Sequence, residues 1–244
     1  MTLALHTSMS RGYARYSWLD TYYSFSFAGY FNPERMGFGA LRVLNDDTIA
    51  PGGGFDTHPH DNMEIITIPL SGALAHRDSM RHEQVVSAGE IQVMSAGTGI
   101  FHSEYNASDE DPVRLLQIWV RPREQGVTPR YDQMSLDGLR KRNQLYQVVS
   151  PNPDDGGLWI HQDAWFSLGE FDAGVSDVYR RHSDGSGVYL FCIEGGLDVA
   201  GATIRRRDAL ALSDVEMIEM EAFEESRFLL MEVPFAPRAK EESQ

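Results

Sequence analysis

The segment "THPHDNMEI" at residues 57–65 places three groups that can bind a metal ion within seven positions. Side chains at i and i+2 of a β-strand point to the same face, so His58 and His60 should face one side. Glu64 has the same parity and joins them if the strand stays regular to that point. The preceding "PGGG" at 51–54 allows the tight turn that would bring such a strand into a barrel mouth.

A second pair with the same spacing occurs in "SAGTGIFHSEY", where His102 and Glu104 follow a glycine-rich turn. An isolated His-X-His is usually part of a surface strand, and the matching second pair is what favours a metal site. If the two strands converge inside a barrel, they offer three imidazoles and one or two carboxylates. Nitrogen and oxygen ligand sets without cysteine suit iron(II), manganese, nickel, copper or zinc.

The other histidines and the single cysteine have no such partners in sequence. His76 and His82 lie in "AHRDSMRHEQ", which we interpret as a polar, solvated hairpin without a role, and His6 and His161 as structural. Cys192 lies in an apolar run and is predicted to belong to the core.

The composition excludes several classes of function. The 244 residues carry 21 basic and 36 acidic side chains, for a formal charge of −15. Such a surface repels nucleic-acid phosphates and anionic membranes, so we expect no direct binding to either. Because there is one cysteine, no signal-peptide-like start and no apolar run long enough to span a membrane, we expect a cytoplasmic protein.

Short apolar runs separated by Gly, Asp, Asn and Pro clusters dominate the chain and predict an all-β sandwich or barrel. The runs lie at 40–44, 64–70, 90–94, 114–120, 188–194, 208–212, 215–221 and 227–233. The best helical candidate is "SLDGLRKRNQLYQ" at 135–147.

The chain also repeats itself, because "IITIPLSGALAHRDS" from residue 65 resembles "LFCIEGGLDVAGATI" from residue 190. We therefore predict an N-terminal metal-binding domain at 1–135 and a second domain at 136–244. Aligning the copies puts His182 opposite His58 but Asp184 opposite His60. The region after "ALALSD" has no histidine, so the second domain is expected to lack a complete metal set.

Several long motifs resemble the pirin family: "GGGFDTHPHDNMEIITIPLSG", "SAGTGIFHSEYN", "SFSFAGYFNPERMGFGALRVLNDD", "LLQIWVRP" and "TPRYDQ". The resemblance implies a bicupin, with two antiparallel jelly-roll barrels packed face to face. It also implies one divalent metal, normally iron, in the first barrel, held by His58, His60, His102 and Glu104. In cupins generally the carboxylate ligand would be Glu64; in pirins it is the glutamate at position 104, and Glu64 becomes a neighbour of the site or a base beside the substrate.

Bacterial pirin-like proteins resemble quercetinases, which are dioxygenases that open the central ring of flavonols. The resemblance thus implies an aromatic substrate and dioxygen, with Glu64 or Glu104 taking the proton of the flavonol 3-hydroxyl. An alternative is a metal-dependent, redox-responsive protein-binding module similar to eukaryotic pirin, a transcription cofactor. Iron(II) is the favoured metal, nickel, manganese, copper, cobalt and zinc remain open, and a monomer is expected.

Overall fold

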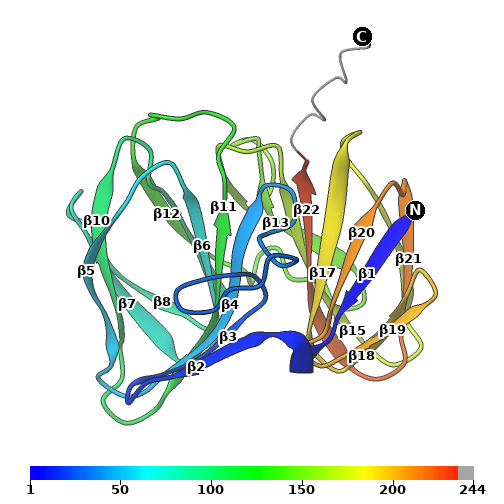
Figure 1. Ribbon diagram of the computed structural model, residues 1–244, viewed down its shortest axis with the longest axis horizontal. Coiled ribbons are helices and arrows are strands. Elements are labelled where there is room, and N and C mark those ends of the chain that lie inside the picture. Colours follow the sequence, from blue (N-terminus) through cyan, green and yellow to red (C-terminus); the bar gives the residue numbers. More distant parts are fainter. Residues whose placement is uncertain (236–244) are drawn as a thin grey trace.

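The computed structural model describes residues 1–235 as two stacks of β-strands that lie side by side (Figure 1). The larger sheet of the N-terminal half has the order β12-β9-β6-β11-β4-β3-β2, and the smaller sheet has the order β5-β10-β7-β8. Their bounds are β2 (Gly12–Arg15), β3 (Leu19–Tyr23), β4 (Leu41–Ile49), β5 (Gly54–His60), β6 (Glu64–Ser71), β7 (Ala73–Asp78), β8 (Glu83–Ser87), β9 (Glu90–Ser95), β10 (Ile100–Asn106), β11 (Val113–Val120) and β12 (Arg130–Ser135).

The C-terminal half repeats this design with the orders β1-β20-β17-β22-β15-β13-β14 and β16-β21-β18-β19. The strands are β1 (Thr2–His6), β13 (Leu145–Ser150), β14 (Leu158–Trp159), β15 (Trp165–Phe171), β16 (Ser176–Arg180), β17 (Ser186–Glu194), β18 (Gly196–Val199), β19 (Ala202–Arg205), β20 (Ala209–Ser213), β21 (Met217–Ala222) and β22 (Ser226–Pro234). The predicted all-β fold with two jelly rolls is confirmed, although the sheets form open sandwiches and do not close into complete barrels.

The strand orders of the two halves correspond, which confirms the internal repeat, except that β14 pairs parallel with β13 where β2 pairs antiparallel with β3. Strands β5, β10, β7 and β8 occupy the places that β16, β21, β18 and β19 occupy in the other small sheet. One strand departs from the sequence order. Strand β1, at the start of the chain, belongs to the C-terminal sheet and pairs with β20. It corresponds to β12, which pairs with β9 in the N-terminal sheet. The boundary near residue 135 stays a prediction, with β12 in the first large sheet and β13 in the second.

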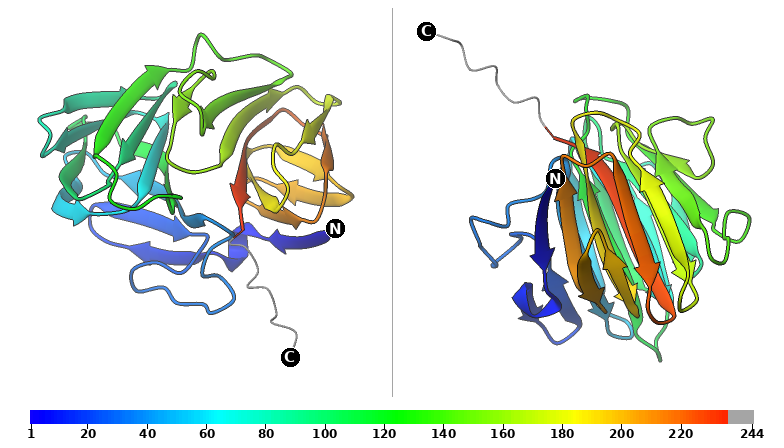
Figure 2. Two further views of the ribbon diagram at one scale, coloured as in Figure 1. Left: turned by 90° about the horizontal axis from the view of Figure 1, so that it is seen from above. Right: turned by 90° about the vertical axis from the view of Figure 1, so that its right-hand side faces the viewer.

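The two large sheets pack face to face (Figure 2). Their apolar side chains form one core between the halves. Ile66 and Ile118 come from the N-terminal sheet, and Phe166 and Leu229 from the C-terminal sheet; all four are fully buried. Separate clusters fill the inside of each sandwich, and the predicted core position of Cys192 is confirmed in the C-terminal one. The shared core fixes one half rigidly against the other.

Shortening Phe166 to alanine should therefore destabilise the whole chain. Phe→Ala in a buried core typically costs about 3–5 kcal/mol of unfolding free energy. The control is Phe31→Ala, because Phe31 is 72% exposed, and it should change stability by less than about 0.5 kcal/mol. Urea unfolding measures both; equal stability of the two variants would show that the interface between the halves contributes little.

The helix predicted at 135–147 is wrong. Strand β12 ends at Ser135, a turn follows, and β13 begins at Leu145. Leu136 is buried, and Asn143 adopts a φ of +63°, which no right-handed helix contains. Ion pairs from Arg140 to Glu170 and from Arg142 to Asp172 hold this segment as an irregular strap, so tertiary contacts overrode a modest helical preference.

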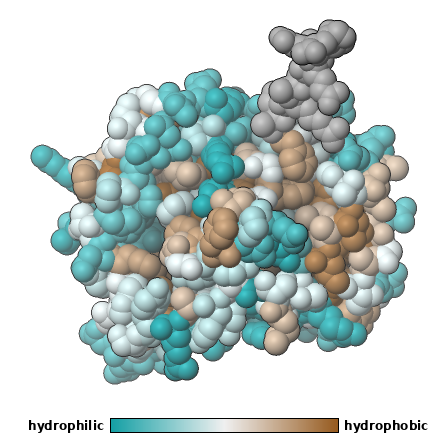
Figure 3. Space-filling view, in the orientation of Figure 1, coloured by the Kyte–Doolittle hydropathy of each residue, from teal (hydrophilic) through white to brown (hydrophobic). Residues whose placement is uncertain are grey.

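Polar and weakly polar residues cover most of the face seen in Figure 3, as the charge of −15 would suggest. Brown, hydrophobic residues gather on the side of the C-terminal half. Leu3 and Leu5 of the edge strand β1 are exposed. Within residues 1–235, no helix has the length and apolar character needed to cross a membrane.

Candidate metal centre

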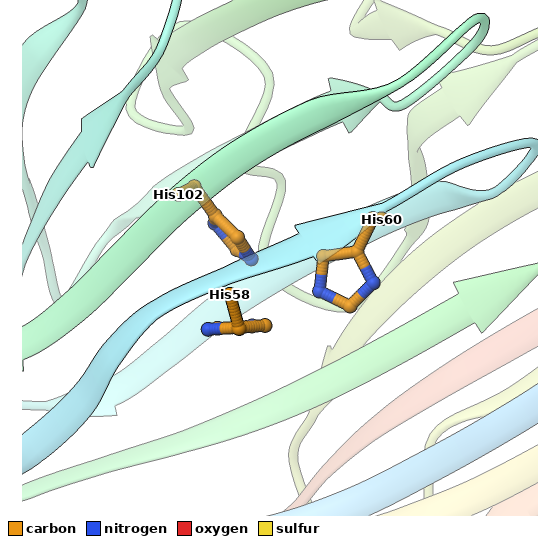
Figure 4. Close-up of side chains that lie close together, drawn as sticks. All are labelled: His58, His60 and His102. Carbon is orange, nitrogen blue, oxygen red and sulfur yellow. The ribbon is translucent and has the colours of Figure 1, made fainter.

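Three histidines meet on two neighbouring strands of the small N-terminal sheet (Figure 4). In the β5–β10 ladder His58 lies directly opposite His102, and His60 lies opposite Ile100. The ring centroids are 4.5 Å apart for His58 and His102, 4.8 Å for His58 and His60, and 4.9 Å for His60 and His102. One ring nitrogen from each lies within 4.8 Å of the others, which is a spacing that a single metal ion can bridge.

The surroundings keep His60 and His102 neutral, as metal binding requires. Burial, with a smaller contribution from His58, lowers the pKa of His60 to about 4. Burial and the neighbouring histidines lower the pKa of His102 to about 2. His58 Nδ1 lies 2.7 Å from the carbonyl oxygen of Asp56; donation of its proton there leaves Nε2 as the free donor atom. Both ring nitrogens of His102 are buried without a hydrogen-bond partner among residues 1–235.

Glu104 is buried in the same region, two residues after His102, beyond a bulge in the β5–β10 ladder. It groups with His102 and His76, whose ligand atoms all lie within 4.8 Å of one another, and it lines the same cavity as the three facing histidines. Burial raises the pKa of Glu104 to about 7. A divalent cation at this position would favour the ionised carboxylate. The imidazole and carboxylate donors of His58, His60, His102 and Glu104 suit a divalent metal, and His102 belongs to both groups of close ligand atoms, one with His58 and His60 and the other with His76 and Glu104.

A row of amides holds the Glu104 carboxylate. Gln117 Nε2 donates to Oε2 at 2.8 Å, and Gln92 Nε2 lies 3.4 Å from Oε1. Thr67 donates to Gln117 Oε1 at 3.0 Å, and Tyr131 donates to Gln92 Oε1 at 3.2 Å. These residues were not predicted from the sequence, although each amide is a polar side chain inside an apolar strand.

His76 is not the solvated hairpin residue that the sequence suggested. It is 2% exposed, lies opposite Glu104 in the β7–β10 ladder, and stacks on Tyr131 with ring centroids 4.7 Å apart. Asp78 lies 3.4 Å from its Nε2 and accepts a 2.8 Å hydrogen bond from His82 Nδ1. The period-two alternation of Leu74, His76 and Asp78, all buried, is the signal that could have revealed this inward face.

The structure does not bring Glu64 to the histidines. Strand β5 ends at His60, Asn62 turns the chain with a φ of +45°, and Glu64 starts β6 in the other sheet. Glu64 shares the parity of Ile66, which belongs to the core between the halves, and it accepts a 2.7 Å hydrogen bond from Ser95 Oγ. The parity argument failed because the strand does not continue through the turn.

A cavity of about 420 Å³ opens beside the histidines and Glu104, within the size range typical of small-molecule sites. Its walls are mainly apolar and aromatic. The Trp119 and His60 rings meet edge-on, with their centroids 4.8 Å apart. The lining residues are Trp18, Phe27, Asn45, Asp47, Gly54, Phe55, Asp56, His58, His60, Ile65, His102, Glu104, Gln117 and Trp119.

Gly54 controls how closely β5 approaches β10. A Cβ at this position would lie 2.5 Å from the backbone oxygen of Glu104 and 2.5 Å from the Tyr105 ring. Gly54→Ala should push the strands apart and separate His58 and His60 from His102, so it should weaken metal binding without changing a ligand.

Overpacking of this kind typically lowers the free energy of unfolding by roughly 1–3 kcal/mol. A competition titration with a chelator would measure the expected loss of metal affinity. Gly138→Ala is the matched control, because no heavy atom lies within 4 Å of the added Cβ. Unchanged metal affinity in Gly54→Ala would show that the strand spacing does not matter for binding.

The C-terminal half uses its corresponding position differently. His182 stacks on Trp165 at 4.7 Å and packs against Glu232, whose carboxylate also accepts hydrogen bonds from Tyr179 and Ser186. Within the described part of the chain, groups of three potential metal ligands occur only in the N-terminal half.

Comparison with known proteins assigns both halves of the chain to described protein families. The family profile "Pirin" matches residues 5–120, and the profile "Quercetinase C-terminal cupin domain" matches residues 147–233. The chain is thus a bicupin, with one cupin in each half. It belongs to the pirin family.

Individual relatives agree with this assignment. The chain is 42% identical over 234 residues to a protein of Escherichia coli K12 named quercetin 2,3-dioxygenase, covering 94% of this chain and 98% of that one. It is 37% identical to a pirin-like protein of Caulobacter vibrioides, covering 91% and 95%. The crystal structure of the bacterial pirin YhhW from Escherichia coli in complex with nickel(II) superposes with a TM-score of 0.91 at 40% identity, covering 96% of this chain and all of that one.

Proposed function

We propose that this protein is a metal-dependent dioxygenase that opens the central ring of flavonols such as quercetin. The observation that carries the proposal is the set of three facing histidines and one buried carboxylate at an aromatic cavity. The relatives named quercetin 2,3-dioxygenase support the reaction class, and the nickel(II) complex of YhhW supports a divalent metal.

In this proposal His58, His60, His102 and Glu104 hold one divalent metal. When bound, the metal supplies a Lewis acid and a template for the substrate and dioxygen. Iron(II) remains our first choice, with nickel, manganese, copper, cobalt and zinc as alternatives. The absence of a comparable ligand group in the described C-terminal half supports one metal per chain.

The chain's own groups bind the substrate and exclude water. The rings of Trp18, Phe55 and Trp119 provide apolar walls for a flat aromatic molecule. Gln92 and Gln117 fix the Glu104 carboxylate by hydrogen bonds to both of its oxygens. A second lone pair on each oxygen remains available, so Glu104 can contribute one oxygen to the metal and accept the flavonol 3-hydroxyl proton at the other.

Proton removal from the 3-hydroxyl prepares the ring for attack by dioxygen. Both oxygen atoms enter the opened product, and one ring carbon leaves as carbon monoxide. Product analysis tests this: metal-loaded protein incubated with quercetin in air should release one carbon monoxide per quercetin consumed. Consumption of quercetin without carbon monoxide would point to a different oxidation and would refute this assignment.

The alternative remains a metal-dependent protein-binding module, which the net charge of −15 favours because an acidic surface can dock a basic partner. The two proposals differ in what the metal does. An enzyme needs metal and substrate in one cavity, whereas a binding module needs the metal only to set its surface.

A further inference from the structure

A second cavity adjoins the cavity beside the histidines, and we call it the second lobe. This lobe, of about 210 Å³, shares five lining residues with the first: Trp18, Phe27, Asn45, Asp47 and Phe55. Its other walls come mainly from the first strands of the N-terminal sheet and include the rings of Tyr16 and Tyr23. A substrate bound at the histidines therefore has room for a part that lies away from the metal.

Asn45 and Asp47 lie where the two lobes meet. They alternate on β4 and so face the same side of the sheet, with Asn45 next to Gln117 on one neighbouring strand and Asp47 next to Thr21 on the other. The two residues are 4% and 3% exposed. The Oδ1 atom of each is buried and has no hydrogen-bond partner within the described residues.

Such unpartnered acceptors need an explanation, because buried polar atoms are nearly always hydrogen-bonded in folded proteins. The neighbouring amides differ: Gln92 and Gln117 are engaged with Glu104. Asn45 Oδ1 points to a missing donor in a cavity with aromatic walls, and beside it Asp47 Oδ1 and the buried hydroxyl of its cross-strand neighbour Thr21 also lack partners within the described residues.

The charges select the kind of donor. Burial raises the pKa of Asp47 to about 7; the adjacent Thr21 hydroxyl acts against this rise, and nearby Asp46 and Glu104 act with it. Two carboxyl groups so placed disfavour an anionic ligand group. A neutral hydroxyl suits the site, because it donates to an acceptor oxygen and can also accept from a protonated carboxyl.

We propose that Asn45 and Asp47 form a specificity subsite that binds hydroxyl groups on the part of an aromatic substrate remote from the metal. This inference rests on the proposed function, which places the other end of the flavonol at the histidines. It assigns the second lobe to substrate selection: polyhydroxylated flavonols are preferred over flavonols with the 3-hydroxyl alone.

Equilibrium binding without oxygen tests the subsite apart from catalysis. Nickel(II)-loaded protein is titrated anaerobically with quercetin and with 3-hydroxyflavone, which lacks the other hydroxyls, using quenching of tryptophan fluorescence. Trp18 and Trp119 line the cavity and serve as reporters. The wild type should favour quercetin by roughly ten- to one-hundred-fold, the range expected for a hydrogen bond to a polar or charged partner.

Asn45→Leu and Asp47→Leu should reduce this preference toward one while changing the affinity for 3-hydroxyflavone by less than about two-fold. Leucine is close in size to both side chains and brings no polar atom into the cavity, so both variants should fold. Thr48→Val is the matched control, because Thr48 lies on the opposite face of β4, and it should keep the wild-type preference.

If both leucine variants keep the wild-type preference for quercetin, Asn45 and Asp47 do not form a substrate subsite, and ordered water would fill the second lobe. Failure of the proposed function looks different. If the preference exists and depends on Asn45 and Asp47, but the aerobic protein consumes no flavonol, then the subsite stands and the dioxygenase assignment falls.

Discussion

Replacing His58 by alanine should release the metal and abolish flavonol turnover while leaving the fold intact. His58 contacts both other histidines of the site, with ring centroids 4.5 Å from His102 and 4.8 Å from His60. Loss of a group that merely orients a ligand typically costs 10–100-fold in metal affinity, so loss of a ligand should cost more than about 100-fold. The apolar strands stabilise the sandwich independently of this side chain.

Metal content after dialysis tests the expected loss of the metal, and the thermal unfolding curve tests whether the fold stays intact. His161→Ala is the control, because His161 packs on Trp159 away from the three histidines, and it should keep the metal. A His58→Ala protein that retains a full equivalent of metal would contradict the ligand assignment. Loss of its cooperative unfolding transition would contradict the claim that the strands alone hold the sandwich.

Replacement by glutamine should lower metal affinity and turnover at Glu104 but leave both nearly unchanged at Glu64. Glu104→Gln should lower metal affinity, because a neutral amide is a poorer donor than a carboxylate. It should also turn an amide NH₂ toward Gln92 or Gln117, which already present NH₂ groups, and so lose a hydrogen bond. With the proton acceptor weakened as well, turnover should fall by on the order of 10²–10⁴.

Glu64→Gln is the matched variant. Its side chain faces Ser95 and the core between the halves, so metal content and turnover should stay within about two-fold of the wild type. If Glu64→Gln instead loses the metal while Glu104→Gln keeps it, the general cupin pattern applies and Glu104 is not the ligand. A metal-replete but slow Glu64→Gln enzyme would restore Glu64 as the base.

The sequence was most informative where local periodicity and tertiary structure agree. His58 and His60 share a face because β5 stays regular between them, and the matching pair at 102 and 104 lies on the adjacent strand. Glu64 falls outside this agreement, since the turn at Asn62 moves the chain into another sheet. Parity holds within a strand and carries no information across a turn.

Other features depend on contacts between distant segments. The exchange of β1 into the C-terminal sheet leaves no local mark in "TLALH". The amide row joins Thr67, Gln92 and Gln117 from three strands, and only the strand register aligns them. His76 resembled a surface residue because polar neighbours surround it in sequence, while its burial comes from β10 and Tyr131.

The central claim is that a metal bound at His58, His60, His102 and Glu104 supports dioxygenation of a flavonol. The most direct measurement is oxygen uptake with quercetin by one wild-type preparation before metal removal, after chelation, and after reloading with one equivalent of iron(II). We predict uptake that is lost on chelation, returns with one equivalent, and consumes one dioxygen per quercetin. No uptake by the iron-loaded protein at neutral and mildly alkaline pH would contradict the account and favour the metal-dependent binding module.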